Sequence, residues 1–409
     1  MAGDTRLGTF INCFLIMTLL TLILLASMFA TVLQYKPRYI YKETSGVKPR
    51  QTHGKYNVRT ITAHERRIRR LQSIRRKALD IPTCPQVLIF THPRSGSTLT
   101  GHIIQQVHDS FYAFEPLRYL AESLEKGERV TYLNKTERSY QSNDTIWVKA
   151  EILYRWFTCD FERVNMKDLS SMFIGAYSTN LEEYATCLRV IRNPTKSIPG
   201  CFPLLKGQCK RAKVRLIKTV RLDIESVEIL LQLMPNLRVI YLVRDPRGKL
   251  SSQMSLRPAD WEIVTFLAKD LCVLLNKEIE VVLELRDTYP ERLKVLIYER
   301  LAFDPVEFAR RLFAFMDLSF TTELKLVVKS LTMTKGENSA CYWCAKRTDS
   351  YLTANKWRQR VLFKHTKKVD TVCSAVYKHF GYRVLPDESI LRNLSYPLFV
   401  ETNITSSFL

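Results

Sequence analysis

One stretch constrains the fold more than any other feature, because it runs from a buried strand into a helix through a turn of small residues. Residues 86–100 have the sequence QVLIFTHPRSGSTLT. The apolar run at 87–90 is too short for a helix and fits a strand that is buried on both faces. Leu99, Ile103 and Val107 then recur at the spacing of one helix face. A strand, a turn and a helix in this order predict an open α/β sheet.

The turn carries groups that bind anions of the phosphate type. Free backbone N–H groups at a helix N-terminus point towards such an anion, and the helix dipole favours its charge. Gly96 lets the backbone come close, and Arg94 supplies a permanent cation with forked donors. Hydroxyl groups add further donors. The predicted binding residues are His92, Pro93, Arg94, Ser95, Gly96, Ser97 and Thr98.

The known pattern closest to this turn, G-x-x-x-x-G-K-[ST], is absent, because no Lys follows Gly96 and no Gly lies five residues before it. A P-loop that hydrolyses ATP or GTP is therefore disfavoured. The turn resembles the 5′-phosphosulfate loop of sulfotransferases, which use 3′-phosphoadenosine 5′-phosphosulfate (PAPS). The run RSGST at 94–98 is similar to the R-S-G-S-[ST] form of the Golgi carbohydrate 6-O-sulfotransferases. An ordinary strand-to-helix turn remains the alternative for so short a motif.

A second stretch, LRVIYLVRDPRGKLSSQ at 237–253, repeats the layout. The apolar run at 239–243 predicts another buried strand, and we expect a helix to start after Gly248. The stretch resembles the element with which sulfotransferases bind the 3′-phosphate of the same donor, and that resemblance assigns Arg244 and Ser252 to this phosphate. Two such motifs in the right order are far more specific than either one alone.

Glu115 is the first candidate for the base that removes the acceptor's proton. It follows a short strand predicted at 111–114, and ligands of open α/β sheets bind at the carboxyl ends of the strands. The 6-O-sulfotransferases carry a similar F-x-x-x-E-P-L element. The alternatives are a structural Glu115 that caps a helix or pairs with Arg118. The rival bases are His92, His102 and His108.

The remaining strands and helices complete an α/β fold, with a P-loop-like central parallel sheet that is flanked by helices behind an N-terminal transmembrane helix. Lys218 and Arg221, at the exit of one strand, are predicted either to face the ligands or to be solvated. The run YERL at 298–301 resembles the family's Y-E-D-L with Arg300 in place of the acid, and Arg358 is either a cofactor contact or a surface residue. We expect strands at 215–221 and 295–298, and helices at 64–79, 224–233, 261–285 and 306–316, the last with Asp304 as its N-cap.

The N-terminal part is predicted to hold the chain on a membrane. No charged residue occurs from 7 to 35, a stretch long enough to span a bilayer. The predicted divisions are a cytoplasmic tail (1–6), a signal-anchor (7–35), a basic stem (36–83) and a lumenal sulfotransferase domain (84–409). The net charge of +22 favours anionic partners. The stem is interpreted as a spacer, and collection of anionic glycans is the alternative.

The orientation of this anchor is argued in both directions. Cations just after residue 35 oppose a lumenal body by the positive-inside rule. Four N-glycosylation sequons and the nine cysteines that follow the anchor favour an oxidising lumen. We therefore expect a type II single-pass protein of the Golgi membrane with its catalytic domain in the lumen. The sequons begin at Asn134, Asn143, Asn393 and Asn403.

The cysteines are predicted to form structural disulfides. Four of them, Cys159, Cys187, Cys201 and Cys209, fall in one region, and their spacing leaves all three pairings open. Zinc is the alternative, but no close pair of Cys or His ligands supports it. Cys341 and Cys344 form a C-x-x-C without a thioredoxin-like context, so a disulfide is favoured there too.

The family resemblance implies the activity. A sulfuryl group would move from PAPS to the 6-hydroxyl of galactose, N-acetylglucosamine or N-acetylgalactosamine in a glycan or proteoglycan, with no metal and no nucleic acid. Glu115 and Arg94 would be catalytic, the latter countering charge on the leaving phosphate. The alternatives are a protein-tyrosine sulfotransferase, another P-loop phosphotransferase, and a membrane-tethered glycan-binding protein without activity. The acceptor sugar and a homodimer are left open.

Overall fold

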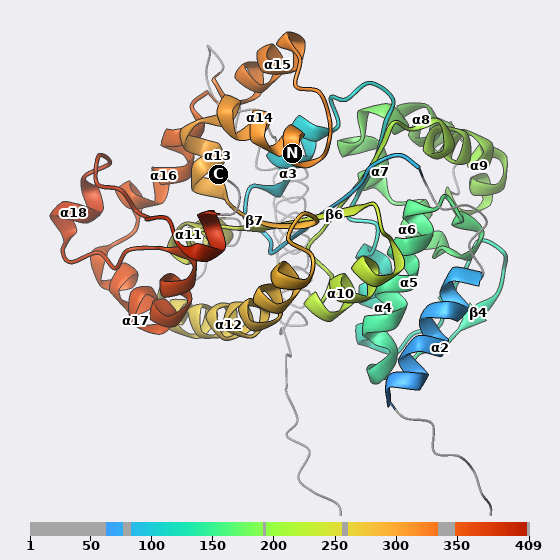
Figure 1. Ribbon diagram of the computed structural model, residues 1–409, viewed down its shortest axis with the longest axis horizontal. Helices are drawn as coiled ribbons and strands as arrows, with labels where there is room; N and C mark the ends of the chain where they lie inside the picture. The colour runs from blue at the N-terminus through green and yellow to red at the C-terminus, as the bar shows by residue number, and fades with distance from the viewer. Residues whose placement is uncertain (1–62, 77–82, 191–193, 256–260, 334–347, 407–409) are drawn as a thin grey trace, which may run out of the picture. The chain divides into compact units, whose positions relative to one another are not determined.

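The computed structural model describes residues 63–76, 83–190, 194–255, 261–333 and 348–406 (Figure 1). Five parallel strands form the central sheet in the order β2-β5-β1-β6-β7, which confirms the predicted parallel sheet. A separate antiparallel pair joins β3 (Val130–Thr131) and β4 (Glu137–Arg138). The strands of the main sheet are β1 (Gln86–Thr91), β2 (Ser110–Phe114), β5 (Val214–Thr219), β6 (Leu237–Val243) and β7 (Leu293–Ile297).

Helices cover both faces of this sheet, because alternate residues of each strand point to opposite sides and nearly all of them are apolar. In Figure 1, α10 and α12 lie below the strands, and α3, α14 and α15 lie above them. The helices that pack with the first face are α5 (Thr145–Phe157), α10 (Ile224–Leu233), α12 (Val264–Thr288) and α17 (Phe363–Phe380). Those of the second face are α3 (Ser97–Ile104), α13 (Tyr298–Phe303), α14 (Pro305–Phe315), α15 (Thr322–Thr332) and α16 (Ser350–Arg360).

The centre of the sheet contains a topological switch point. β1 lies between β5 and β6, and the helices that follow β1 and β6 leave to opposite faces. Leu99 and Ile103 of α3 pack with the second face, whereas Leu250 and Met254 of α11 (Pro246–Met254) pack with the first. The carboxyl ends of β1 and β6 therefore border a crevice, which is where open α/β sheets bind their ligands.

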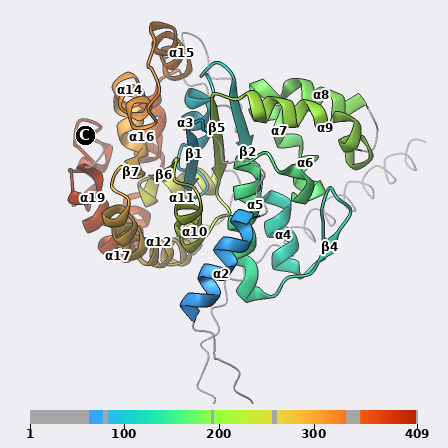
Figure 2. The same cartoon turned by 45° about the vertical axis from the view of Figure 1, so that its right-hand side comes forward.

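The first described helix, α2 (Ala63–Arg76), lies within the predicted stem and contacts the body. Figure 2 shows it beside α10 and α5. Arg67 pairs with Glu228 of α10, and Arg70 lies over the ring of Trp147 of α5 at 5.0 Å.

The remaining helices are α4 (Arg118–Lys126), α6 (Met166–Leu169), α7 (Met172–Tyr177), α8 (Glu182–Val190), α9 (Pro194–Arg211), α18 (Glu388–Arg392), α19 (Asn403–Ser406) and the 3-10 turns η1 (Ser142–Asp144), η2 (Phe161–Arg163), η3 (Thr179–Leu181) and η4 (Trp261–Ile263).

Three disulfides join cysteines that the structure describes. Cys159 pairs with Cys209 and Cys187 with Cys201, which selects one of the three pairings left open by their spacing. Cys272 pairs with Cys373 and so joins α12 to α17. The C-x-x-C at 341–344 lies outside the described residues. The predicted structural disulfides are thus confirmed for these six cysteines.

The predicted membrane anchor at 7–35 also lies outside the described residues. Among the helices that are described, none combines the length and the apolar character that crossing a bilayer demands. The asparagines of all four sequons are described, and each is exposed.

Candidate functional site

The loop between β1 and α3 has the backbone that an anion site needs. Arg94 and Gly96 both adopt left-handed conformations, with φ of 70° and 86°. Gly96 is the N-cap of α3, and no side chain caps the helix. The first N–H groups of α3 therefore donate no hydrogen bond to a capping side chain and point out of the helix. This bears out the strand, turn and helix predicted from residues 86–100.

The side chains of the loop differ in where they point. Ser95 and Ser97 are buried, Thr98 is half-buried and Pro93 is exposed. His92 turns back into the protein, where its Nε2 lies 2.7 Å from Oε2 of Glu278 on α12. The imidazole of His92 is thus held against the sheet. The backbone of the loop, which starts at His92, stays at the crevice.

The predicted second element contacts this loop directly. The Nε of Arg94 donates to Oγ of Ser252 over 3.0 Å, and Nη1 of Arg244 donates to the carbonyl of Arg94 over 2.9 Å. Since both elements start from neighbouring strands at the same sheet edge, they form one site. Arg94 and Ser252 are 158 residues apart in the sequence, yet their side chains are in contact. The two predicted motifs are therefore close enough to hold a single ligand.

Contacts with the described residues hold only part of the Arg244 guanidinium. The guanidinium lies 4.7 Å from the ring centre of Tyr298, and its Nη2 donates to the carbonyl of Ala354. The Nε is buried and has no hydrogen-bond partner among the described residues. A buried donor without a partner is costly in a folded protein. An anion in the crevice would satisfy it.

Gly96 packs so closely against the ring of Tyr298 that a substitution at Gly96 tests the importance of this contact. A Cβ at Gly96 would lie 2.1 Å from Cδ2 of Tyr298, on the ring that supports Arg244. We expect Gly96→Ala to lower the free energy of unfolding by roughly 1–3 kcal/mol, from overpacking and from the positive φ. The variant should also weaken binding of phosphorylated nucleotides. Denaturant melts and a binding titration measure the two effects.

Gly127 supplies the matched control. Its φ is also positive, at 66°, but a Cβ there would meet nothing within 4 Å. Gly127→Ala should therefore show the backbone cost alone and leave nucleotide binding unchanged. Equal losses in both variants would mean that the contact with Tyr298 is unimportant.

The helix after β6 begins earlier than expected and is already capped. We predicted a start after Gly248, but α11 begins at Pro246, with Asp245 as its N-cap accepting from the N–H of Arg247. A proline at the first helical position after an Asp favours this start. Because a carboxylate occupies this helix end, the second element is left to bind an anion with the side chains of Arg244 and Ser252.

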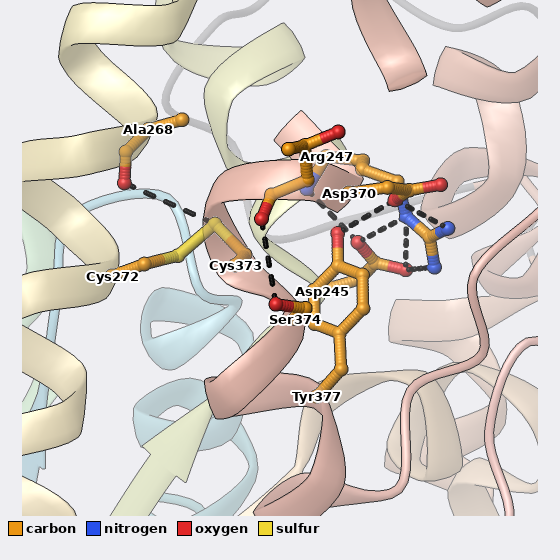
Figure 3. Close-up of a disulfide and its surroundings, with 9 residues drawn as sticks. Asp245, Arg247, Ala268, Cys272, Asp370, Cys373, Ser374 and Tyr377 are labelled. Atoms are coloured by element: carbon orange, nitrogen blue, oxygen red, sulfur yellow. Dashed lines mark hydrogen bonds and ion pairs between the residues drawn. A yellow bond between two sulfur atoms is a disulfide. The ribbon is translucent and has the colours of Figure 1, made fainter. Parts of the chain in front are cut away.

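A buried ionic network fixes α11 from behind. Arg247 pairs with Asp245 at 2.7 Å and with Asp370 of α17 at 3.1 Å, and Tyr377 donates to Asp370 (Figure 3). Burial raises the pKa of Asp370, and the charge of Arg247 opposes that shift. The disulfide between Cys272 and Cys373 fastens the same helix, α17, to α12. The position of the second element therefore depends on contacts with the C-terminal helices.

We expect loss of this disulfide to be costly. The Cys272→Ser/Cys373→Ser variant opens a loop with a sequence separation of 101, so its free energy of unfolding should fall by roughly 3–5 kcal/mol. Nucleotide affinity should fall with it, because α17 holds Arg247. The comparison is Cys187→Ser/Cys201→Ser, with a separation of 14 and no contact to this network. A larger loss in the comparison variant would contradict this account. Denaturant melts and titrations measure both properties.

Glu299 supports the same loop from the other side. Its carboxylate accepts from the N–H of Asp245 at 3.1 Å and from the hydroxyl of Tyr382 at 3.0 Å. Burial, and next the charge of Asp245, raise the pKa of Glu299 to about 7. Arg300, which stands where the family shows an acid, points elsewhere and pairs with Glu401 at 2.8 Å.

Glu115 lies at the same edge of the sheet, two strands from β1. Phe114, Lys218 and Ile89 are in register across β2, β5 and β1, so Glu115 is about 10 Å from β1 at the strand spacing. Its carboxylate pairs with both Lys218 and Arg221 and accepts from the N–H of Val220 at 3.3 Å. The alternative of a solvated cation is therefore wrong for Lys218, which is buried, and Glu115 pairs with Lys218 and Arg221 and not with Arg118.

Two of the rival bases lie away from the crevice. His108 is 85% exposed and pairs with Asp109 before the start of β2, at the opposite edge of the sheet. His102 lies on α3, more than one helical turn after the start of the helix at Ser97 and against the ring of Tyr177. Burial lowers the pKa of His102. Only His92 remains in the site, with its ring held by Glu278.

Arg358 does not reach the site. It is fully buried and donates to the carbonyls of Ile390, Leu391, Asn393 and Tyr396. Both predicted roles, cofactor contact and surface residue, are wrong. A lone Arg in a sequence gives no signal of the carbonyl groups that a later segment brings to it.

Sequence reasoning missed three residues of the site. Tyr298 supports Arg244, Glu278 holds His92, and Lys249 is buried on α11. Glu278 had a usable signal, because it falls on the face of α12 whose other positions are apolar and buried. A carboxylate at such a position indicates a buried polar partner.

Comparison with known proteins is consistent with this geometry. The sequence model described as "Sulfotransferase family" matches residues 85–322. Human carbohydrate sulfotransferase 6 is 25% identical over 361 residues, which cover 76% of this chain and 84% of the relative. Carbohydrate sulfotransferase 3 of Tetronarce californica is 26% identical over 356 residues, which cover 78% and 77%.

Solved structures give more distant matches. The sulfotransferase domain from the curacin biosynthetic pathway is 16% identical with a TM-score of 0.40, covering 73% of this chain and 98% of that one. The sulfotransferase domain of the Synechococcus PCC 7002 olefin synthase is 18% identical with a TM-score of 0.37, covering 72% and 98%.

Proposed function

Because this chain belongs to the sulfotransferase family and is therefore an enzyme of sulfuryl transfer, we propose that it moves a sulfuryl group from PAPS to a sugar hydroxyl of a glycan or proteoglycan. The observation that carries the proposal is the contact between the two cationic loops, from Arg94 to Ser252 and from Arg244 to the carbonyl of Arg94. The names of the similar relatives support a carbohydrate acceptor. Within that class we propose the 6-hydroxyl of galactose, N-acetylglucosamine or N-acetylgalactosamine.

The residues of the crevice fit a donor with phosphate groups at both ends. The uncapped start of α3 and Arg94 suit a 5′-phosphosulfate, and the orphaned Nε of Arg244 with the hydroxyl of Ser252 suits a 3′-phosphate. Gly96 admits a close backbone approach. When bound, PAPS supplies an activated sulfuryl group on a phosphate leaving group.

The residues of the chain would then act in defined roles. Residues 92–98 orient one end of the donor, and Arg94 stabilises negative charge as it develops on the leaving side. Arg244 and Ser252 hold the other end, which aligns the reacting group. Glu115 takes the proton of the attacking hydroxyl. Lys218 and Arg221 hold its carboxylate at the sheet edge, so proton uptake must be accompanied by loosening of one of these ion pairs.

We also propose the compartment. A lumenal Golgi location with an N-terminal signal-anchor is supported by three disulfides, which persist in oxidising compartments, and by four exposed sequon asparagines. Digestion with an endoglycosidase, and protection of the body from added protease in sealed microsomes, test this topology. A body that is unglycosylated and digested would reject it.

The function is tested with the full-length protein in detergent. Labelled PAPS is offered with desulfated keratan, chondroitin and mucin-type glycans, and with a tyrosine-containing peptide. We expect label in at least one glycan, and analysis of the product shows which hydroxyl carries it. Label in the peptide alone would identify a protein-tyrosine sulfotransferase instead.

A thermal-shift measurement separates the remaining alternatives. Adenosine 3′,5′-bisphosphate (PAP), the nucleotide left after transfer, should raise the melting temperature, and ATP should not. Stabilisation by ATP alone would indicate a phosphotransferase. If neither nucleotide stabilises the protein, a glycan-binding protein without activity becomes the better account.

A further inference from the structure

One buried cation at the crevice has no role in the mechanism above. Lys249 lies on α11 and is 7% exposed. Its ammonium makes no hydrogen bond or ion pair with a residue that the structure describes. Lysine side chains are seldom this deeply buried without a partner, because the ammonium keeps only part of its hydration there. This position therefore needs a physical explanation.

The surroundings of Lys249 do not supply a counter-charge of its own. Burial, and next the charge of Arg244, lower the pKa of Lys249 to about 8, and Glu278 acts in the opposite direction. The carboxylate of Glu278 is already shared by His92 and by the hydroxyl of Tyr241. A like charge nearby makes the burial still more unfavourable. Such an arrangement is unsuited to structural stabilisation and suited to an anionic ligand.

The helix geometry aims Lys249 at the crevice. Lys249 and Ser252 are three residues apart on α11, so they share one face of the helix. On that face the hydroxyl of Ser252 contacts Arg94 of the other loop. Arg244, whose charge lowers the pKa of Lys249, lies two residues before the first residue of the helix, and its buried Nε has no hydrogen-bond partner among the described residues. The three side chains thus surround the proposed 3′-phosphate position.

We propose that Lys249 is a third ligand of the donor nucleotide and binds its 3′-phosphate together with Arg244 and Ser252. The inference rests on the proposed function, because it requires a nucleotide that is phosphorylated at this position. A bound phosphate dianion supplies the counter-charge that the free protein lacks. In the free protein Lys249 therefore lowers the free energy of unfolding. Binding of the nucleotide offsets this loss.

The test is Lys249→Met in the full-length protein, with PAP and adenosine 5′-phosphate as probes. The substitution keeps an unbranched apolar stem of similar length and removes the terminal ammonium with its charge. The dissociation constant for PAP should rise about tenfold to one hundredfold, the range for one lost hydrogen bond to a charged group. Affinity for adenosine 5′-phosphate, which has no 3′-phosphate, should stay within about threefold. The melting temperature without ligand should rise, because an uncompensated buried charge is gone.

Controls make each outcome decisive. Lys269→Met on the exposed side of α12 should change neither property. Lys249→Gln, which keeps a polar end, should lose PAP affinity as the Met variant does and covers the case in which that variant fails to fold. Unchanged PAP affinity, an equal loss for both nucleotides, or a lower melting temperature without ligand would overturn the role of Lys249. A wild-type protein that binds no PAP would instead reject the proposed function.

Discussion

Replacing Glu115 with glutamine is expected to lower the turnover number by about 100- to 10,000-fold, the contribution typical of a general base. Glutamine keeps the size of the side chain and one oxygen that Lys218 can bind, but it cannot accept the hydroxyl proton. Donor binding should stay near normal, because Glu115 directly follows β2 and the donor loops follow β1 and β6. Single-turnover rates with labelled PAPS, together with PAP titration, measure the two effects separately.

The competing explanation is that Glu115 serves only as the counter-ion of Lys218 and Arg221. In that case the glutamine variant would lose stability and donor affinity along with turnover. Asp168→Asn is the matched control: this buried carboxylate accepts from the N–H groups of Tyr119 and Leu120 at the start of α4. The control should lose stability and retain turnover. If Glu115→Gln remains within tenfold of wild type, the base is another residue, and His92→Ala is the next variant to test.

Arg94→Ala should reduce turnover by about 100- to 1,000-fold, the usual loss when a charge-stabilising donor is removed from an active site. Its guanidinium joins the two loops through Ser252, so PAP affinity should also fall. Turnover should fall further than affinity, because charge on the leaving phosphate grows only during transfer. Measurement of turnover at saturating PAPS separates the two losses.

A second substitution isolates the charge of Arg94 from its backbone conformation. Arg94 has a φ of 70°, which glycine adopts more readily than any other residue. Arg94→Gly therefore relaxes the loop and removes the guanidinium. We expect it to be as inactive as Arg94→Ala. Recovery of turnover in the glycine variant would mean that the backbone of the loop, and not the cation, carries the effect.

The two loops were predictable because their signals are local. An apolar run that stops at small and cationic residues indicates a strand that enters a turn, and residues 86–100 and 237–253 both carry it. The N-cap at Asp304 was predicted on the same basis and is confirmed by its bond to the N–H of Glu307. The start of α11 was predicted three residues too late, at 249 and not at Pro246, because Asp245 was not recognised as a cap.

The directions of polar side chains were not predictable in the same way. Lys218 and Arg221 looked like flanking charges, yet β2 brings Glu115 to them from more than 100 residues earlier. Arg358 was a candidate for the cofactor, yet the segment that contains Leu391 surrounds it with carbonyl groups. Each partner is supplied by an element that is distant in sequence, so no window of residues contains the information.

The sequence by itself determined the strands, the turn chemistry and the two anion-binding motifs, because hydrophobic periodicity and helix capping depend on neighbouring residues. The tertiary structure alone decided that Arg94 meets Ser252, that Glu115 is held by two cations and that Lys249 is buried without a partner. Those features follow from the order β2-β5-β1-β6-β7, which places the ends of β1 and β6 side by side. Strand order is set by packing of the whole core, and packing is a property of contacts between residues that are far apart in the chain.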